Sequence, residues 1–587
     1  MDSERHLPRW AAFVLILVAF NAAAAVFLKP NYTSPDGVGY FSYLWSVFSE
    51  GTLSFATIYQ KCRIDIPLTR TPEGWLANNW SFGAALLWAP FYEAARVCRG
   101  GAGVTDRETL LLANFGSMIL GGFCLALLYS ALGRIGEKRN RILVALLTLA
   151  GTPLFYYSFI DATYAHAATG FASGLFLWFW LRTSEEEAAP QGKALRGGKR
   201  KIDPAPSSLS ALRWGTLGLL AGVAACVRTQ EMLVILAPAW EWLKRFRAAP
   251  ERRSALWKSA AAMAAGLLIG FSPQLLIWKF LYGSFLAAPA AFNLSWSNFS
   301  LGETVFSSYH GLLAWTPLYA LASAGLLWEA IYGDWRAGAL FLILAGQVLI
   351  NSFSASWWGG QAFGLRQLTG TSLIAGLGTA YFLRRSGEAK TIGRKAGLIA
   401  AGLCSLWTAW LALLCGGGAL DTLSYISPRE LAAAAADFRP ALQAIRQVLA
   451  TRNTFAPDFL VLLLVVEIAA GLWFWRVVAS ERPGASGPPS RWLQATLLGL
   501  VLFADGKIVQ ASRGSRPEFV PGTYIEAAQL GDFFKSEAYE GKALYSAKRG
   551  EKKDAQAYFS RAESLLPASP ATEPWREEFR RRQRENE

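Results

Sequence analysis

The sequence is poor in charged residues and lacks the short motifs of several common enzyme classes. Only 17% of its 587 residues are charged, whereas 53% are hydrophobic and 24 are tryptophan. Such a chain is too apolar for an ordinary soluble protein of this length. It has no GxxxxGK[ST] loop, no GxGxxG after a strand pattern, no HExxH and no GxSxG. These absences argue against ATP, nicotinamide, zinc and serine-hydrolase chemistry, and no cofactor is expected.

Cysteine is also scarce, and its spacing does not indicate a metal site. The six cysteines form neither a CxxC pair nor a Cys/His cluster. Cys62 and Cys98 fall in one predicted external loop. In an oxidising compartment they could form a disulfide, and two free thiols fit the sequence equally well.

Long apolar runs dominate the chain. Runs of about 17–25 residues are long enough to cross a hydrocarbon core, and in lipid such runs must be helices because the backbone has to satisfy its own hydrogen bonds. We therefore predict an all-α polytopic membrane protein with about 13 transmembrane helices (range 11–13). The first run, about 18 residues long, is interpreted as a retained helix and not as a signal peptide. The predicted spans are 10–28, 109–132, 142–158, 164–182, 212–227, 230–243, 257–280, 311–331, 337–353, 368–383, 396–415, 458–478 and 491–509.

Charge patterning sets the expected orientation. The net charge of +15 would suit a nucleic-acid partner, but the basic residues fall in alternate loops near 133–141, 183–212, 244–253 and 384–395. The segment 281–310, by contrast, has no Lys or Arg. This alternation is typical of the positive-inside rule. It predicts a multi-pass protein of the inner (plasma) membrane with a cytoplasmic N-terminus and an external C-terminal tail, and no nucleic-acid partner.

Several segments are expected outside the bilayer core. The first external loop, 29–108, contains two stretches typical of interfacial helices, 40–48 and 82–95. Shorter external segments are expected near 159–165, 281–310 and 353–367. The stretch 183–210 is interpreted as a cytoplasmic linker. In the soluble tail, residues 538–567 resemble one tetratricopeptide-like helix pair, which would serve either as a docking element or as a hairpin packed on the membrane domain.

Ionisable residues gather on the external side. Asp36 lies about eight residues past the first apolar helix, in a turn with Pro35 and Gly37. Ionisable groups at membrane depth are costly and therefore suggest function. The candidate site residues are Asp36, Tyr40, Asp161, His166, Arg228, Glu231, His310, Trp357, Trp358 and Arg366.

Each candidate also has a structural explanation. Asp36 could cap a helix, and Arg228 and Glu231 could form an ion pair three residues apart. Arg366 could extend to the interface, and His166 and His310 could only satisfy internal hydrogen bonds. Tryptophan is common at membrane interfaces in any case.

A lipid-linked phosphosugar fits this set of side chains. Arginine and protonated histidine bind phosphate through charge-assisted hydrogen bonds and stabilise charge on a leaving phosphate. A carboxylate can act as general base for an acceptor hydroxyl, and indole faces can stack on a sugar.

The motifs together resemble those of the C-type (GT-C) integral membrane glycosyltransferases, in the protein-mannosyltransferase-like or aminoarabinose-transferase-like (family 39-like) branch. The resemblance covers roughly 10–385 and rests on the segments at 36–40, 80–90, 164–166, 228–231 and 358–366. It implies that Asp36 is the catalytic base, and that a sugar moves with inversion from a polyprenyl phosphate to a cell-envelope acceptor. The family's second acidic residue is absent beside Asp36, and Asp161 is the candidate substitute. Metal dependence varies in the family, so no metal is predicted.

Three domains follow from this reading: a GT-C-like membrane catalytic domain at 1–385, additional transmembrane helices at 386–510, and a soluble periplasmic tail at 511–587. The main alternative is a polytopic transporter or lipid flippase without glycosyl transfer. Such proteins usually place polar residues near the midplane of internal repeats, and no convincing repeat is found here. A non-catalytic scaffold that uses the C-terminal hairpin is the third possibility.

Overall fold

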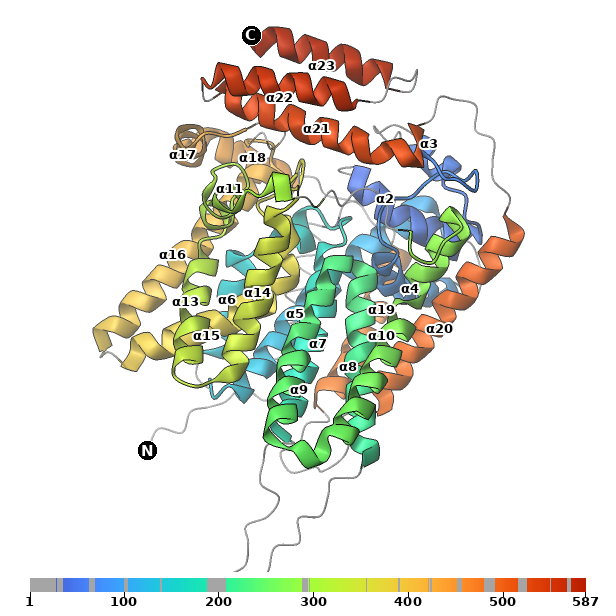
Figure 1. Ribbon diagram of the computed structural model, residues 1–587, viewed down its shortest axis with the longest axis vertical. Coiled ribbons are helices and arrows are strands. Elements are labelled where there is room, and N and C mark those ends of the chain that lie inside the picture. The colour runs from blue at the N-terminus through green and yellow to red at the C-terminus, as the bar shows by residue number, and fades with distance from the viewer. Residues whose placement is uncertain are drawn as a thin grey trace, which may run out of the picture.

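The protein is an all-α polytopic membrane protein, shown here as a computed structural model (Figure 1). The structure describes residues 28, 35–62, 69–99, 104–137, 140–186, 207–287, 294, 296–354, 356–388, 391–420, 422, 425–450, 457–479, 491–515, 525–548, 550–566 and 572–586. Residues 10–27 of the predicted first span, 10–28, and most of the predicted linker 183–210 lie outside these residues.

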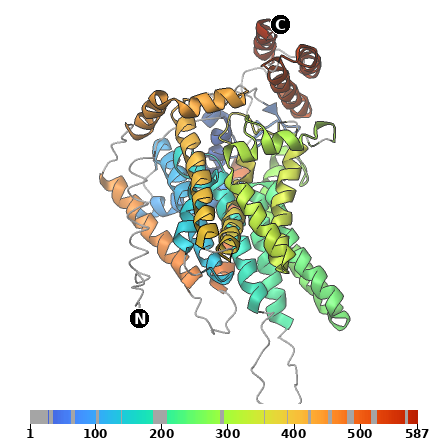
Figure 2. The ribbon, with the colours of Figure 1, turned by 90° about the vertical axis from the view of Figure 1, so that its left-hand side faces the viewer.

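The long helices form a bundle whose main axes run roughly in one direction (Figures 1 and 2). Among the described residues, five helical segments are long and apolar enough to cross a membrane: Asp106–Arg134, Pro250–Tyr282, Trp335–Ser352, Ile392–Gly416 and Leu493–Gly514. Four shorter helices are also apolar: Arg141–Gly151, Ala211–Val227, Leu318–Ile331 and Val461–Phe474. The predicted spans after residue 100 all fall on helical segments, which confirms the predicted fold class.

The bundle helices begin and end close to the predicted spans. They are α5 (Asp106–Arg134), α6 (Arg141–Gly151), α7 (His166–Glu186), α8 (Ser207–Val227), α9 (Leu236–Ala248), α10 (Arg253–Tyr282), α13 (Leu318–Ile331), α14 (Trp335–Ser352), α15 (Ser372–Glu388), α16 (Thr391–Gly416), α19 (Pro457–Ala479) and α20 (Arg491–Gly514). A capping box of Thr105 and Glu108 begins α5, and Gly283, in the left-handed region, ends α10.

Shorter elements gather at one end of the bundle, together with the C-terminal tail (Figure 1). They are α2 (Pro35–Tyr43), the π-helix η1 (Leu44–Glu50), α3 (Ala56–Cys62), α4 (Gly83–Cys98), α11 (Leu301–Phe306), α12 (Leu312–Trp315), α17 (Pro428–Ala436) and α18 (Phe438–Ala450). Of the two stretches predicted as interfacial helices, 40–48 falls on α2 and η1, and 82–95 falls on α4 and the residue before it. Cys62 and Cys98 are not joined in a disulfide.

The described part of the tail contains three helices and not only the predicted pair. α21 (Ala527–Lys548) and α22 (Lys552–Leu565) coincide with that pair, and α23 (Glu573–Asn586) packs on both. A short strand before α21, β2 (Ile525–Glu526), pairs in parallel with β1 (Thr69–Arg70) of the first loop. The tail is thereby joined to the membrane domain by backbone pairing.

Helices α8 and α10 approach each other closely because glycine lines their contact. A Cβ atom added at Gly218 would overlap the backbone at Met263, and one added at Gly222 would overlap the backbone beside Gly270. Small residues four apart on both helices are typical of tight helix pairs in membranes. This contact fixes the C-terminal part of α8, and the chain continues from there directly into Arg228.

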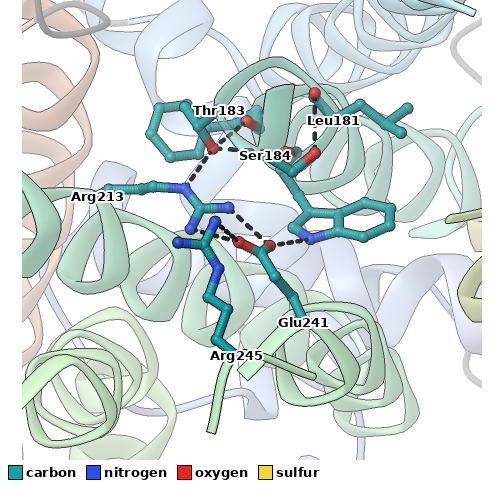
Figure 3. Close-up of polar contacts among 8 residues, drawn as sticks. Leu181, Thr183, Ser184, Arg213, Glu241 and Arg245 are labelled. Atoms are coloured by element: carbon teal, nitrogen blue, oxygen red, sulfur yellow. Dashed lines mark hydrogen bonds and ion pairs between the residues drawn. The ribbon is translucent and has the colours of Figure 1, made fainter. Parts of the chain in front are cut away.

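A charged cluster joins α7, α8 and α9 at the end of the bundle away from the tail (Figure 3). Arg213 donates from Nη1 and Nη2 to the two carboxylate oxygens of Glu241, at 2.9 and 2.8 Å, and from Nε to Thr183 Oγ1 at 2.8 Å. Glu241 also accepts from Arg245 Nη2 at 2.6 Å and from Trp180 Nε1 at 2.9 Å. We call Arg213, Glu241 and Arg245 the Glu241 cluster. Both oxygens of the Glu241 carboxylate thus accept hydrogen bonds from protein side chains.

Candidate active site

Asp36 lies in the first turn of α2, at the tail-facing end of the bundle. Its Oδ1 accepts a hydrogen bond from Trp80 Nε1 at 2.8 Å, and its Oδ2 forms an ion pair with Arg366 Nη1. Trp80 approaches this closely because Gly39 has no side chain: a Cβ atom there would overlap the indole. The Asp36 side chain remains 28% exposed. The carboxylate is thus held in one orientation and stays accessible.

Arg366 comes from the end of the external segment 353–367, where the 3₁₀ helix η6 (Arg366–Thr371) begins. Its guanidinium lies over the Tyr164 ring at 5.0 Å, and its Nε has no hydrogen-bond partner in the described part of the chain. Tyr164 in turn stacks on His166, with ring centroids 5.5 Å apart and planes 19° apart. The ion pair with Asp36 therefore continues into an aromatic stack.

Arg228 lies on the other side of that stack. It occupies the extended residue between α8 and the 3₁₀ helix η3 (Thr229–Ile235). Its Nη1 is 3.0 Å from His166 Nδ1 and its Nη2 is 3.4 Å from Gln230 Oε1. Because arginine can only donate, the facing ring nitrogen of His166 accepts, and the imidazole is neutral in this arrangement.

The Arg228 guanidinium has no carboxylate partner within ion-pair distance among the described residues, and its buried Nε has no partner there either. The ion pair with Glu231 that sequence spacing allows is not formed. A partly buried cation without an anion is costly, and it is a natural site for an anionic ligand.

Glu231 points instead into the protein. Its Oε2 accepts from Ser173 Oγ at 2.9 Å and from Gln347 Nε2 at 3.3 Å, and the side chain is only 1% exposed. Gln230 bonds Gln347 Oε1 at 3.1 Å and the Gln367 carbonyl at 2.9 Å. These bonds connect η3, α14 and η6 beneath Arg228. Glu231 therefore lies behind the site and not at its surface.

Tyr40 lies close to the charged residues of the site. Burial raises the pKa of its hydroxyl, and the charges of Arg228, Asp36 and Arg366 all act on it. We use the name external cluster for Asp36, Tyr40, His166, Arg228 and Arg366. These five predicted site residues come together from segments up to 330 positions apart.

The remaining predicted residues are not part of this cluster. Asp161 is buried and accepts from Thr163 Oγ1 at 3.1 Å. His310 is fully buried between Tyr309 and Trp315, with ring centroids 4.5 and 5.2 Å away, and it adopts a left-handed φ of 62°. Trp357 and Trp358 are buried with Tyr309, Tyr425 and Ala538 of α21. A sugar-stacking role for the two tryptophans stays a prediction.

Sequence reasoning did not single out Trp80 and Tyr164 as site residues. Each lies inside a segment used for the family resemblance, but neither is charged at neutral pH, so no charge marked it. Their contacts with Asp36 and Arg366 are visible only in three dimensions. The described residues hold no group of three or more His, Cys, Asp or Glu side chains that could bind a metal ion.

Comparison with known proteins gives only distant likeness. No family model and no curated protein matches the chain. Among solved structures, it is similar to the crystal structure of the Archaeoglobus fulgidus oligosaccharyltransferase tethered to an acceptor peptide containing the NVT sequon. The TM-score is 0.40 and the identity 11%, over 78% of this chain and 63% of that one. The chain thus spans less than two thirds of that protein, and the likeness is too distant to carry a function across.

Proposed function

We propose that the protein is a membrane glycosyltransferase. It transfers a sugar from a polyprenyl-phosphate donor to an external, periplasmic acceptor in the cell envelope, with Asp36 as general base. The observation that carries this proposal is the external cluster, in which an accessible carboxylate and a guanidinium without a carboxylate partner share one site. General-base catalysis needs the first, and a phosphate leaving group needs the second.

The chemistry is a single inverting displacement. The acceptor hydroxyl oxygen forms a bond to the anomeric carbon of the sugar while the bond from that carbon to the phosphate oxygen breaks. The hydroxyl proton passes to Asp36, and the negative charge that remains on the lipid phosphate is stabilised by Arg228. Trp80 and Arg366 hold the Asp36 carboxylate by one oxygen each, so that a remaining lone pair is free to accept the proton.

The orientation in the membrane agrees with this assignment. Helix α2, whose first turn contains Asp36, lies at the tail-facing end, whereas the basic turn between α9 and α10 lies at the opposite end (Figure 1). By the positive-inside rule that opposite end faces the cytoplasm. We assign the site and the tail to the periplasmic side of a bacterial inner membrane, and residues 1–385 to the catalytic domain.

A transfer assay tests the proposal. Purified protein in lipid and an Asp36→Asn variant receive a panel of radiolabelled polyprenyl-phosphate sugars, with membrane extract as acceptor. The asparagine keeps the shape and the bond from Trp80 but cannot take a proton, so transfer should fall by about 100- to 10,000-fold. Asp532→Asn, at an exposed carboxylate of α21, is the matched control and should leave transfer unchanged.

The outcomes separate the functional classes. Transfer by the parent and by Asp532→Asn, with loss in an equally stable Asp36→Asn protein, supports a glycosyltransferase and names the donor. Equal transfer by Asp36→Asn removes Asp36 as the base. No transfer by any variant, together with movement of labelled lipid across the bilayer, would favour the transporter.

A further inference from the structure

The first tail helix, α21, lies across the external end of the bundle (Figure 1) and is anchored at both of its ends. Before its first residue, Ile525 and Glu526 pair with Thr69 and Arg70. Near its last residue, Tyr545 packs on Tyr425 with ring centroids 4.4 Å apart, and Lys548 Nζ donates to the Tyr425 carbonyl at 2.9 Å. The helix is thereby fixed over the surface that holds the external cluster.

Between these anchors, Ala538 and Gly541 of α21 pack on the tryptophans of the segment 353–367. Gly541 faces the six-membered ring of Trp358, and a Cβ atom at Gly541 would come within 2.7 Å of Cζ2 and 3.0 Å of Cη2. The indole cannot easily move aside, because it is 8% exposed and packs with Trp357, Tyr309 and Tyr425. Only glycine fits this contact without a shift of one of the two elements.

The turn that begins at Trp358 leads directly to Arg366. Gly359 and Gly360 have φ of 82° and 72°, which turn the chain back on itself. A Cβ atom at Gly359 would lie 2.5 Å from Gln367 Nε2, and one at Gly360 would lie 3.9 Å from Arg366 Nη2. The beginning of the turn therefore packs against its end, and a shift at Trp358 moves the surroundings of Arg366.

The rest of the turn is fixed to the aromatic stack of the site. Tyr164 Oη donates to the Gln361 carbonyl at 3.3 Å, and the Phe363 backbone N–H donates to Tyr157 Oη at 2.9 Å. Tyr164 is also the ring under the Arg366 guanidinium. Docking of α21, the turn 357–366 and the Asp36–Arg366 ion pair are thus parts of one continuous set of contacts.

We infer that Gly541 and Trp358 are positioning residues: docking of α21 onto Trp358 holds the turn 357–366 and so places Arg366 against Asp36. This inference rests on the proposed function for its effect on catalysis, while its structural part stands apart from it. It assigns the tail a role in the membrane site itself and gives Trp358 a protein contact in place of a sugar.

Three variants test the inference. Gly541→Leu puts a side chain into the indole ring. Gly541→Leu/Trp358→Ala combines the same change with removal of that ring, so the leucine fills the space of the indole and keeps α21 docked at this point. Asp532→Leu adds a leucine at an exposed position of the same helix and is the control. Small misplacements of catalytic groups are costly, so Gly541→Leu should lower kcat by about 10- to 100-fold. KM for the donor should change little, because Arg228 lies on another element.

A second readout does not depend on activity. Phenylglyoxal modifies accessible arginines, and mass spectrometry gives the rate at each position. Arg366 is 15% exposed and ion-paired, so it should react slowly in the parent and several-fold faster in Gly541→Leu, relative to the exposed Arg439. The double variant should return both kcat and the Arg366 rate toward the parent values.

The two readouts test the proposed function and the inference about α21 separately. If the parent transfers no sugar, the proposed function fails, and the Arg366 rates still decide the inference. Parent-like kcat and Arg366 rates in Gly541→Leu would overturn the inference. A fall in kcat without faster modification of Arg366, and without recovery in the double variant, would also overturn it, since the change would then be a general loss of structure.

Discussion

The Glu241 cluster and the external cluster lie at the two ends of the bundle and each contain two arginines and one carboxylate, but they use these residues in opposite ways. In the Glu241 cluster both arginines bond to the same carboxylate, which also accepts from Trp180. In the external cluster only Arg366 pairs with the carboxylate of Asp36, while Arg228 faces a histidine. The charged groups are of the same types. The two clusters differ in how completely ion pairs and hydrogen bonds within the protein pair these groups.

A structural charge cluster differs from a candidate site in how completely other protein groups pair its charged side chains. Glu241 is 3% exposed and all its contacts come from α7, α8 and α9, so nothing is left for a ligand (Figure 3). Asp36 is 28% exposed, and Arg228 and Arg366 each keep a buried Nε without a partner in the described part of the chain. Breaking the first cluster should therefore affect folding, and breaking the second should affect chemistry.

The largest effect is expected from Glu241→Ala. It leaves Arg213, whose side chain is 6% exposed, buried without its counter-charge. Removing one partner of a buried pair typically costs about 3–5 kcal/mol of unfolding free energy. Reversible unfolding in mixed micelles measures this loss.

Arg213→Met/Glu241→Leu is the control for that prediction, since replacing both charges with apolar groups restores most of the stability. The small fraction of Glu241→Ala that folds should transfer sugar normally per molecule. A double variant as unstable as the single one would show that packing, and not the unpaired charge, is responsible.

Arg228→Gln should lower activity strongly and stability little, which is the opposite of the result expected for Glu241→Ala. The glutamine cannot carry the positive charge offered to a leaving phosphate, so kcat should fall by about 100- to 1,000-fold. The free energy of unfolding should change by no more than about 1 kcal/mol, because no carboxylate loses a partner. Steady-state transfer and unfolding measured on the same sample check both parts.

Arg228→Lys sharpens that test, because it retains the charge without the planar fork and should recover part of the activity. A loss of stability in Arg228→Gln as large as that of Glu241→Ala would place Arg228 with the structural charges. The comparison between the two ends of the bundle would then be wrong.

The sequence predicts the bundle better than it predicts these charge pairings. Membrane spans are long apolar runs with an obligatory helical backbone, so composition alone locates them. Helices α17 and α18 were not predicted because α17 has only 9 residues and α18 mixes polar and apolar residues, so neither contains an apolar run of membrane-spanning length. The third tail helix, α23, was missed for a similar reason, since it is rich in Arg and Glu.

The sequence predicts which residue types form the candidate site and on which side of the membrane they lie. It does not predict which of these side chains contact each other. Spacing of three suggested an Arg228–Glu231 pair, yet Arg228 has extended backbone angles of −151° and 123°, so the two residues do not share a helical face. The Asp36–Arg366 pair joins residues 330 positions apart, and no local rule reaches that far. The contact between Trp358 and Gly541 depends likewise on how the tail folds back.

The smallest effect concerns His310, a buried neutral group next to the external cluster. Burial lowers its pKa to about 3, and the positive charge of Arg366 acts in the same direction. Its ordinary value is about 6.5. The unfolded chain therefore binds a proton more readily than the folded one, and stability is lost as the pH falls below about 6.5. Between pH 6.5 and 5.5 this loss amounts to about 1 kcal/mol.

His310→Asn isolates that contribution. Asparagine does not titrate, and it tolerates the left-handed φ of 62° better than most residues do. The variant should be less stable than the parent at pH 7.5, because it loses ring contacts with Tyr309 and Trp315. Its unfolding free energy should nevertheless fall by about 1 kcal/mol less than that of the parent between pH 6.5 and 5.5. Equal slopes would mean that His310 takes up a proton in the folded protein. The neutral, structural role that separates it from the charged residues of the external cluster would then be lost.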